Sequence, residues 1–354
     1  MRHIRHERQF DTITLSCDVG GTNTSIGAVG RVGRRFELID QLRLSTRDQT
    51  SLESPLRDGI DRFKSKVDYF DYLCVSGAGP VRENRCRLSN VSWEIDGDAL
   101  SSSLGIPATV INDFTAISYG VPLLDVTDPG QITPIPRSGD EKRSRSKGRR
   151  VYAVVGAGTG LGVGYLIGTK KRLEAFPSEG GHTLFGPFDG ITREFYDYLT
   201  RRYGELLDTE LFVSGQGIAN LADFYRESGR LTGEAKRALD GVERVDVPAR
   251  VADLAVEDES ARQIMEVFVS MYGKVAANVA LTFLPTEGLY LAGGIASKNE
   301  GWFTKSDTFT RAFEGVYKNS LVDTLRQTPV YIIKDYAISL YGAAHAAYWI
   351  LDRG

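Results

Sequence analysis

The chain carries one short pattern twice, and this repeat constrains the fold more than any other feature of the sequence. The first copy is LSCDVGGTNTSIGAVG (Leu15–Gly30) and the second is YAVVGAGTGLGVGYLIG (Tyr152–Gly168). Equivalent positions hold a glycine, a threonine, a second glycine and an aliphatic residue, at Gly21 and Gly158, Thr22 and Thr159, Gly27 and Gly164, and Val29 and Leu166. Each copy is typical of a β-strand, a glycine-rich turn and a second β-strand. Because a repeated motif marks a repeated structural unit, the sequence predicts a duplicated α/β unit.

The segments that follow each copy mix strand-like and helix-like patterns. In the first half, the predicted strands are 35–44, 72–79 and 108–113, and the predicted helix is 52–63. In the second half, the predicted strands are 171–176, 288–294 and 329–335, and the predicted helices are 191–204, 259–284 and 337–351. A chain of 354 residues is long enough for two domains. We expect a small α/β lobe of residues 1–120, joined by a terminal helix at 338–354, and a large α/β lobe of residues 121–337.

The composition excludes several classes of protein. A formal net charge of -3 gives no general electrostatic attraction for nucleic acid. The start, MRHIRHERQF, lacks the apolar run of a signal peptide, and no uninterrupted apolar stretch approaches the ~20 residues that a membrane span needs. Three dispersed cysteines and four histidines indicate neither a disulfide framework nor a multi-histidine metal site. A cytoplasmic protein without a nucleic-acid or membrane partner is therefore expected.

The two glycine-rich turns favour phosphate binding without a known nucleotide fingerprint. No GxxxxGK[ST] occurs, and GAGTGLG fails the strict GxGxxG pattern and leads into a strand, so a dehydrogenase is disfavoured. Glycines let successive backbone N–H groups approach an anion, and Thr22 and Thr159 would add hydroxyl donors at matched positions. Asp18 is the one carboxylate at the first turn. Since a carboxylate beside phosphates needs a cation between them, Asp18 suggests Mg²⁺, bound through water.

The stretch FPSEGGHTLFGP (Phe176–Pro187) places Glu179 three residues before His182, with only two glycines between them. The pair could be a metal half-site, an acid–base couple, a clamp for a polar ligand or a turn. The two glycines oppose a helix, and the other histidines lie far away in the sequence, which weakens the metal interpretation.

Asp113, after the predicted strand ATVIN, could be a catalytic base or, with Asn112, a turn or helix cap.

Five motifs in order, DVGGTN, INDFTA, GAGTGLGV, EGGH and LAGGI, closely resemble the bacterial glucokinase family, within the sugar kinase, heat-shock 70 and actin superfamily. The resemblance runs from about Leu15 to the terminal helix. It implies a two-lobed ribonuclease H-like, actin-like ATPase fold of class α/β, with a duplicated mixed-sheet unit and an interlobe cleft. It implies ATP held by both turns with Mg²⁺, and a hexose 6-phosphotransferase that uses glucose.

The resemblance also implies roles for individual residues. Asp113 matches the catalytic base, and the sugar contacts match Asn112, Asp113, Glu179, His182 and Glu210. On this reading the EGGH glycines give clearance for the sugar ring against bare backbone. The nucleotide site would comprise Cys17, Asp18, Val19, Gly20, Gly21, Thr22, Asn23, Gly158, Thr159, Gly160, Gly293 and Gly294, with Asp18 on the metal side. Asn90 could face the cleft or be a turn residue.

Other functions fit parts of the same pattern. The enzyme could phosphorylate mannose, fructose or an amino sugar. The chain could instead be a sugar-responsive regulator without catalysis, or an actin-like or chaperone-like ATPase. The basic segment 137–150 is interpreted as a solvated loop, with contact to a polyanion or a long phosphate donor as the sharper alternative. A homodimer is expected.

Overall fold

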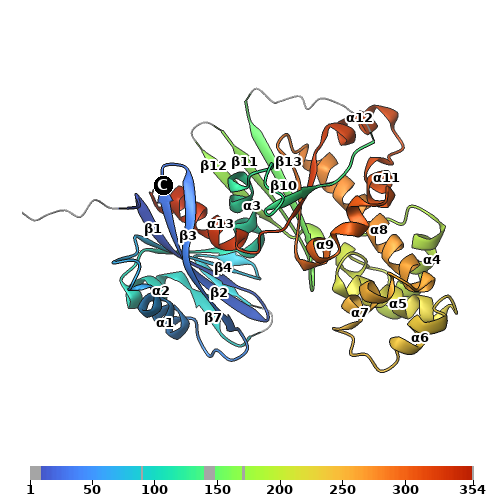
Figure 1. The fold of residues 1–354 in the computed structure, drawn as a ribbon, viewed down its shortest axis with the longest axis horizontal. Helices are drawn as coiled ribbons and strands as arrows, with labels where there is room; N and C mark the ends of the chain where they lie inside the picture. The colour runs from blue at the N-terminus through green and yellow to red at the C-terminus, as the bar shows by residue number, and fades with distance from the viewer. Residues whose placement is uncertain (1–8, 89–90, 139–147, 170–171, 353–354) are drawn as a thin grey trace, which may run out of the picture. The chain divides into compact units, whose positions relative to one another are not determined.

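The computed structural model describes residues 9–88, 91–138, 148–169 and 172–352, which form a mixed α/β protein (Figure 1). The chain divides into two compact units. The first comprises Met1–Asp125, Lys170–Pro177 and Asp335–Gly354, and the second comprises Val126–Thr169 and Ser178–Lys334. Asn90 and most of the basic segment, at 139–147, lie outside the described residues.

The first unit is built on a five-stranded sheet. Its order is β3-β2-β1-β4-β8, with β3 at Arg35–Ser45, β2 at Asn23–Val32, β1 at Thr12–Val19, β4 at Tyr72–Gly77 and β8 at Ala108–Asn112. The first repeat forms the antiparallel pair β1–β2, while β4 runs parallel to β1 and β8 runs parallel to β4. Apolar runs in β1 and β4 are almost wholly buried, as expected for strands covered on both faces. The sheet therefore brings the carboxyl ends of β1, β4 and β8 to one edge.

Helices and a small sheet complete the first unit. They are α1 (Glu53–Phe63), α2 (Gly97–Leu104), α3 (Asp113–Gly120), α13 (Ile338–Ala347) and the three-stranded sheet β5 (Val81–Arg82), β6 (Arg85–Arg87) and β7 (Glu94–Asp96). The terminal helix ends earlier than predicted, because a π-helical turn, Tyr348–Asp352, follows it. Helix α13 packs against α3 and β1, and a Cβ added at Gly342 would lie 1.8 Å from the carbonyl oxygen of Ala116. Only glycine permits this close crossing of the two helices.

The second sheet has six strands, and all but β12, most of which lies in the segment Lys170–Pro177 of the first unit, belong to the second unit. Its order is β12-β11-β10-β13-β14-β9, with bounds Leu173–Ser178, Leu161–Gly168, Arg150–Ala157, Gly288–Ala292, Val330–Ile333 and Ile132–Pro134. The second repeat forms the antiparallel pair β10–β11, and β13 runs parallel to β10, as β4 does to β1. Strand β14 is parallel to β13. The duplicated mixed-sheet unit predicted from the repeat is therefore confirmed.

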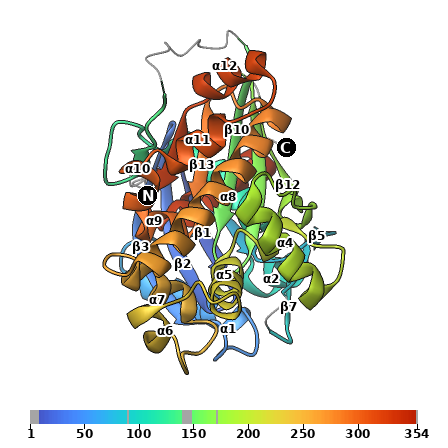
Figure 2. The ribbon, with the colours of Figure 1, turned by 90° about the vertical axis from the view of Figure 1, so that its right-hand side faces the viewer.

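Helix α8 (Glu259–Phe283) lies at the centre of the second unit. It packs against β10 and against α5 (Gly215–Glu227), α7 (Val247–Leu254) and α11 (Thr308–Glu314), as Figure 2 shows. Among the described residues it is the one helix long and apolar enough to cross a membrane by length and composition, but 67% of its most apolar window is buried inside the structure. A core helix of a folded domain has the same character. The remaining helices are α4 (Gly190–Tyr203), α6 (Gly233–Ala238), α9 (Gly294–Lys298), α10 (Glu300–Thr304) and α12 (Asn319–Gln327).

Candidate active site

In the first unit, the turn between β1 and β2 is stabilised by a hydrogen bond from Thr46, which lies outside the turn in the sequence. The backbone N–H of Gly20 donates to the carbonyl of Asn23 over 3.0 Å, and the hydroxyl of Thr46 donates to the carbonyl of Gly20 over 2.8 Å. The side chains of Cys17 and Val19 are fully buried in the core. These two residues can therefore offer a ligand only their backbone groups, and burial raises the pKa of the Cys17 thiol.

Asp18 stands at the end of β1, opposite Ser76 of β4 in the parallel register. The Ser76 hydroxyl donates to Oδ1 of Asp18 over 2.6 Å. Burial raises the pKa of Asp18, and the hydrogen bonds from Ser76 and Ser339 oppose this shift. Asp18 is thus a positioned carboxylate beside the glycine turn.

Asn112 and Asp113 lie at the same sheet edge, at the junction of β8 and α3. Asn112 pairs in register with Gly77, which pairs with Val19, so the ends of three neighbouring strands coincide. The side chain of Asn112 caps α3: its Oδ1 accepts from the backbone N–H groups of Phe114 and Thr115, over 2.9 and 3.3 Å. The capping role considered for Asn112 is therefore real. Its Nδ2 donates to the carbonyl of Gly79 over 3.2 Å, and the Asn112 side chain also hydrogen-bonds the carboxyl group of Asp113.

Asp113 is the first residue of α3, and its carboxyl group is strongly perturbed. Burial, followed by the negative charge of Asp18, raises the pKa of Asp113 to about 6. A hydrogen bond of 2.9 Å from the backbone N–H of Phe114 to Oδ1 lowers it in part. A carboxylate whose pKa lies close to neutrality suits a general base.

In the second unit, the turn between β10 and β11 is open on one side and tightly packed on the other. Among the described residues, no atom lies within 4 Å of a Cβ placed at Gly158. A Cβ at Gly160 would instead lie 2.4 Å from Oε2 of Glu210, and one at Gly293 would lie 2.5 Å from the carbonyl of Ala157. Gly293 also has a φ of 89°, which favours glycine. The β10–β11 turn and the loop after β13 therefore come together, as a shared nucleotide site requires.

Glu210 belongs to a short 3₁₀ turn, η3 (Thr209–Leu211), and is not the isolated solvent-facing glutamate that its local sequence suggests. Its Oε2 accepts a hydrogen bond of 2.8 Å from the backbone N–H of Leu161, the first residue of β11. The structure thus joins a predicted sugar contact to the predicted phosphate turn.

The EGGH stretch also forms a 3₁₀ turn, η2 (Gly180–His182). Its two glycines lie against β11: a Cβ at Gly181 would lie 1.9 Å from the carbonyl of Leu161, and one at Gly180 would lie 3.0 Å from Cβ of Val163. The space beside Gly181 is therefore occupied by the backbone of β11, and the space beside Gly180 by the side chain of Val163. Because residues three apart in a 3₁₀ turn lie on the same side, Glu179 and His182 can still act together.

His182 is hydrogen-bonded to Asp208, a residue that the sequence analysis did not identify as a site residue. Its Nδ1 lies 2.8 Å from Oδ2 of Asp208. The hydrogen bond to Asp208 is the largest cause that raises the pKa of His182. Burial, the second cause, lowers this pKa, and the negative charges of Glu210, Asp208 and Glu179 raise it further. Asp208 has no local sequence signal, since it is one of several acids in LLDTELF.

These groups fit a metal–nucleotide complex better than a protein-held metal. Among the described residues no cluster of three or more histidine, cysteine, aspartate or glutamate side chains could hold a metal ion. Mg²⁺ needs only one or two protein carboxylates when phosphates and water supply its other ligands, and Asp18 meets this need. The residues present therefore fit Mg²⁺ that arrives with a polyphosphate.

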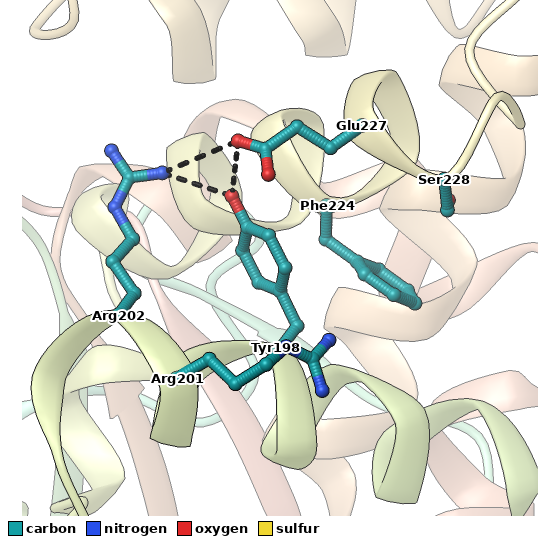
Figure 3. A pocket seen from close by; sticks show the side chains of 6 residues that line it. All are labelled: Tyr198, Arg201, Arg202, Phe224, Glu227 and Ser228. Carbon is teal, nitrogen blue, oxygen red and sulfur yellow. Dashed lines mark hydrogen bonds and ion pairs between the residues drawn. The ribbon is translucent and has the colours of Figure 1, made fainter.

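The second unit also has a surface pocket between α4 and α5, away from the predicted residues (Figure 3). Its polar groups pair with one another: Nη1 of Arg202 donates to the hydroxyl of Tyr198 over 2.9 Å and lies 3.8 Å from Glu227. The Tyr198 hydroxyl donates to Glu227 over 2.8 Å. Three of the six residues that line the pocket are thus paired with one another.

Two mixed sheets, each opened by a strand–turn–strand pair that presents a glycine turn, define the class of actin-like ATPase folds. Comparison with solved structures gives the same fold. A glucokinase from an Antarctic psychrotroph matches with a TM-score of 0.79 and 24% identity, covering 96% of this chain and 99% of that one. A ROK family glucokinase from Streptomyces griseus, in complex with glucose and AMPPNP, matches with a TM-score of 0.61 and 20% identity, covering 94% and 98%.

Sequence comparison identifies the family within this class. The Glucokinase family model matches residues 15–349. A glucokinase from Synechocystis is 35% identical over 358 residues, which are 94% of this chain and 97% of that protein. The chain therefore belongs to the glucokinase family and is an enzyme of the kinase class.

Proposed function

We propose that this protein is an ATP-dependent glucokinase that transfers the γ-phosphoryl group of Mg-ATP to the 6-hydroxyl of glucose. The observation that carries the proposal is Asp113, at the shared carboxyl edge of β1, β4 and β8, with a pKa raised to about 6. Membership of the glucokinase family supports it.

Asp113 is the general base of this proposal. Phosphoryl transfer needs the attacking alcohol to be positioned and to lose its proton. At neutral pH, a carboxyl group with a pKa of about 6 is mostly ionised and still basic enough to accept that proton. The hydrogen bonds from the N–H of Phe114 and from the side chain of Asn112 hold the carboxylate in place, and it would accept the proton of the sugar hydroxyl.

The sugar is bound by Asn112, Asp113, Glu179, His182 and Glu210 in this proposal. Carboxylates suit a sugar because two oxygens can accept from two adjacent hydroxyl groups. The amide of Asn112 adds a donor from the first unit. Glu179, His182 and Glu210 act as one group, because the charges of both glutamates act on His182.

The nucleotide is bound by backbone groups of the two turns, 17–23 and 158–160, and of the loop at Gly293 and Gly294. The open face at Gly158 supports this assignment. Asp18 would hold Mg²⁺ through water, and the ion would neutralise charge on the phosphates. The same proposal includes two lobes with a cleft between them, a homodimer and a cytoplasmic location. The small lobe comprises residues 1–120 and 338–354, and the large lobe comprises residues 121–337.

A coupled assay of ADP release with Mg-ATP and a panel of glucose, mannose, fructose and glucosamine tests the proposal. We expect the highest kcat/KM with glucose. A different preferred sugar would assign another hexose kinase. ATP hydrolysis that does not depend on sugar would favour a chaperone-like ATPase, and sugar binding without turnover would favour a regulator.

A further inference from the structure

The turns η2 and η3 are joined into one element by two threonines. The backbone N–H and the hydroxyl of Thr209 both donate to the carbonyl of Thr183, each over 2.8 Å. The hydroxyl of Thr183 donates to the carbonyl of Gly180 over 2.8 Å. An isolated antiparallel bridge between Leu184 and Asp208 continues the connection. The hydrogen bonds therefore hold η2 and η3 together.

Asp208 connects this joined element to His182 through both of its carboxylate oxygens. Oδ1 accepts from the backbone N–H of Leu211 over 3.3 Å and so caps η3, while Oδ2 contacts Nδ1 of His182. An ionised carboxylate can only accept hydrogen bonds, so Nδ1 of His182 must be the donor. The remaining nitrogen, Nε2, is then an acceptor in the neutral ring and a donor in the charged ring.

Because Nδ1 of His182 is bonded to Asp208, Nε2 is the ring nitrogen that can contact a ligand. The side chain is 52% exposed, so the ring is not enclosed by protein. Its titratable neighbours are Asp208 and Glu210 from η3 and Glu179 from the start of η2. Strand β11 meets η2 through Leu161 and Val163, which are apolar. Within the described part of the chain, the charged groups that act on the ring are therefore carboxylates.

We propose that Asp208 is a positioning residue for sugar binding: by accepting the Nδ1–H of His182 it fixes the ring's tautomer and orientation, so that Nε2 is presented to a sugar hydroxyl. The inference rests on the proposed function, because it assumes that His182 contacts the sugar. It adds a residue that acts through His182 without touching the substrate.

The Asp208→Asn variant tests the mechanism directly. The cap on Leu211 requires an oxygen, so the new amide N–H₂ turns towards Nδ1 and favours the opposite tautomer. We would titrate the full-length protein, labelled with ¹⁵N-histidine and without substrate, and follow His182 by NMR. His182→Gln identifies its signals among the four histidines. We expect the pKa of His182 to fall and its Nδ1–H tautomer to be lost in Asp208→Asn, and both to be largely restored in Asp208→Glu.

Asp189→Asn is the matched control, because Asp189 caps α4 in the same unit and does not contact His182. Its histidine titration should match that of the wild type. In kinetics, we expect Asp208→Asn to raise KM for glucose about tenfold, with kcat and KM for ATP within about twofold. If the wild type binds sugar without turnover, the Kd by calorimetry replaces KM.

Two results would overturn the inference. One is an unchanged His182 titration in Asp208→Asn; the other is a changed titration with unchanged sugar affinity. A wild-type protein that neither binds nor phosphorylates sugars would overturn the proposed function, whereas the NMR titration decides independently whether Asp208 controls His182.

Discussion

The backbone N–H of Leu161 donates a hydrogen bond of 2.8 Å to the side chain of Glu210, 49 residues later in the chain. Leu161 begins β11, directly after the glycine turn, and Glu210 lies in η3. The neighbouring Gly160 leaves no room for a Cβ beside the same carboxylate. The proposed sugar site and the proposed phosphate site of the second unit are thus joined by one side chain.

Gly160→Ala should disturb both sites at once. Its methyl group would displace the Glu210 carboxylate, which lies at the flexible end of a side chain, so stability should change little. We expect KM for both glucose and ATP to rise and kcat/KM to fall about tenfold or more in steady-state assays. Gly186→Ala is the control, since no described atom lies within 4 Å of its added Cβ. A change in only one KM would separate the two sites.

Asp113→Asn should abolish most turnover while sugar still binds. The amide keeps the size of the side chain and cannot accept the proton, and loss of a general base typically costs about 10²–10⁴-fold in rate. We expect kcat to fall by about that factor, with the Kd for glucose by calorimetry within about fivefold. Asp61→Asn, on the exposed side of α1, should behave as wild type. Near-normal turnover in Asp113→Asn would remove Asp113 from the mechanism.

The raised pKa of Asp113 predicts opposite pH trends for activity and stability. The base must be ionised, so kcat/KM should fall as the pH drops through about 6. The folded-state pKa lies above the ordinary value of 3.8, so the folded protein binds the proton more tightly than the unfolded chain. The contribution of this group to stability is therefore present at low pH and is lost as the pH rises through about 6.

Thermal unfolding of Asp113→Asn beside the wild type checks the stability trend. The quantity to compare is the Tm of the variant minus the Tm of the wild type at each pH. This difference should be larger at pH 7.5 than at pH 4.5, because ionisation of Asp113 destabilises only the wild-type fold. A pH-independent difference would mean that the pKa of Asp113 is not raised in the folded protein.

Gly342→Ala should destabilise the first unit. The added methyl group would meet the carbonyl of Ala116, a backbone atom that moves only if α13 and α3 separate. Overpacking of this kind costs about 1–3 kcal/mol or more, measurable as a lower Tm. Gly33→Asn is the control: Gly33 has a φ of 61° in open space, a conformation that asparagine accepts. Equal Tm values for the two variants would contradict the tight crossing.

Local sequence predicted the two strand–turn–strand pairs, several of the other strands and helices, and the duplicated unit, because apolar alternation and turn glycines act within a few residues. It also placed Asp113 at a strand end and two glycine turns at equivalent positions. Asn112 followed the capping rule for its residue type, and the family motifs carried the class of enzyme.

Tertiary structure decided which side chains meet. Ser76 reaches Asp18 through the parallel register of two strands, Asp208 reaches His182 through the threonine contacts of η2 and η3, and Glu210 reaches Leu161. None of these pairs is close in sequence, so no local pattern encodes them. The EGGH glycines show the same limit: their sequence suggests space for a ligand, whereas in the fold Gly181 admits the backbone of β11 and Gly180 the side chain of Val163. Register and close backbone packing, which depend on the whole chain, set these contacts.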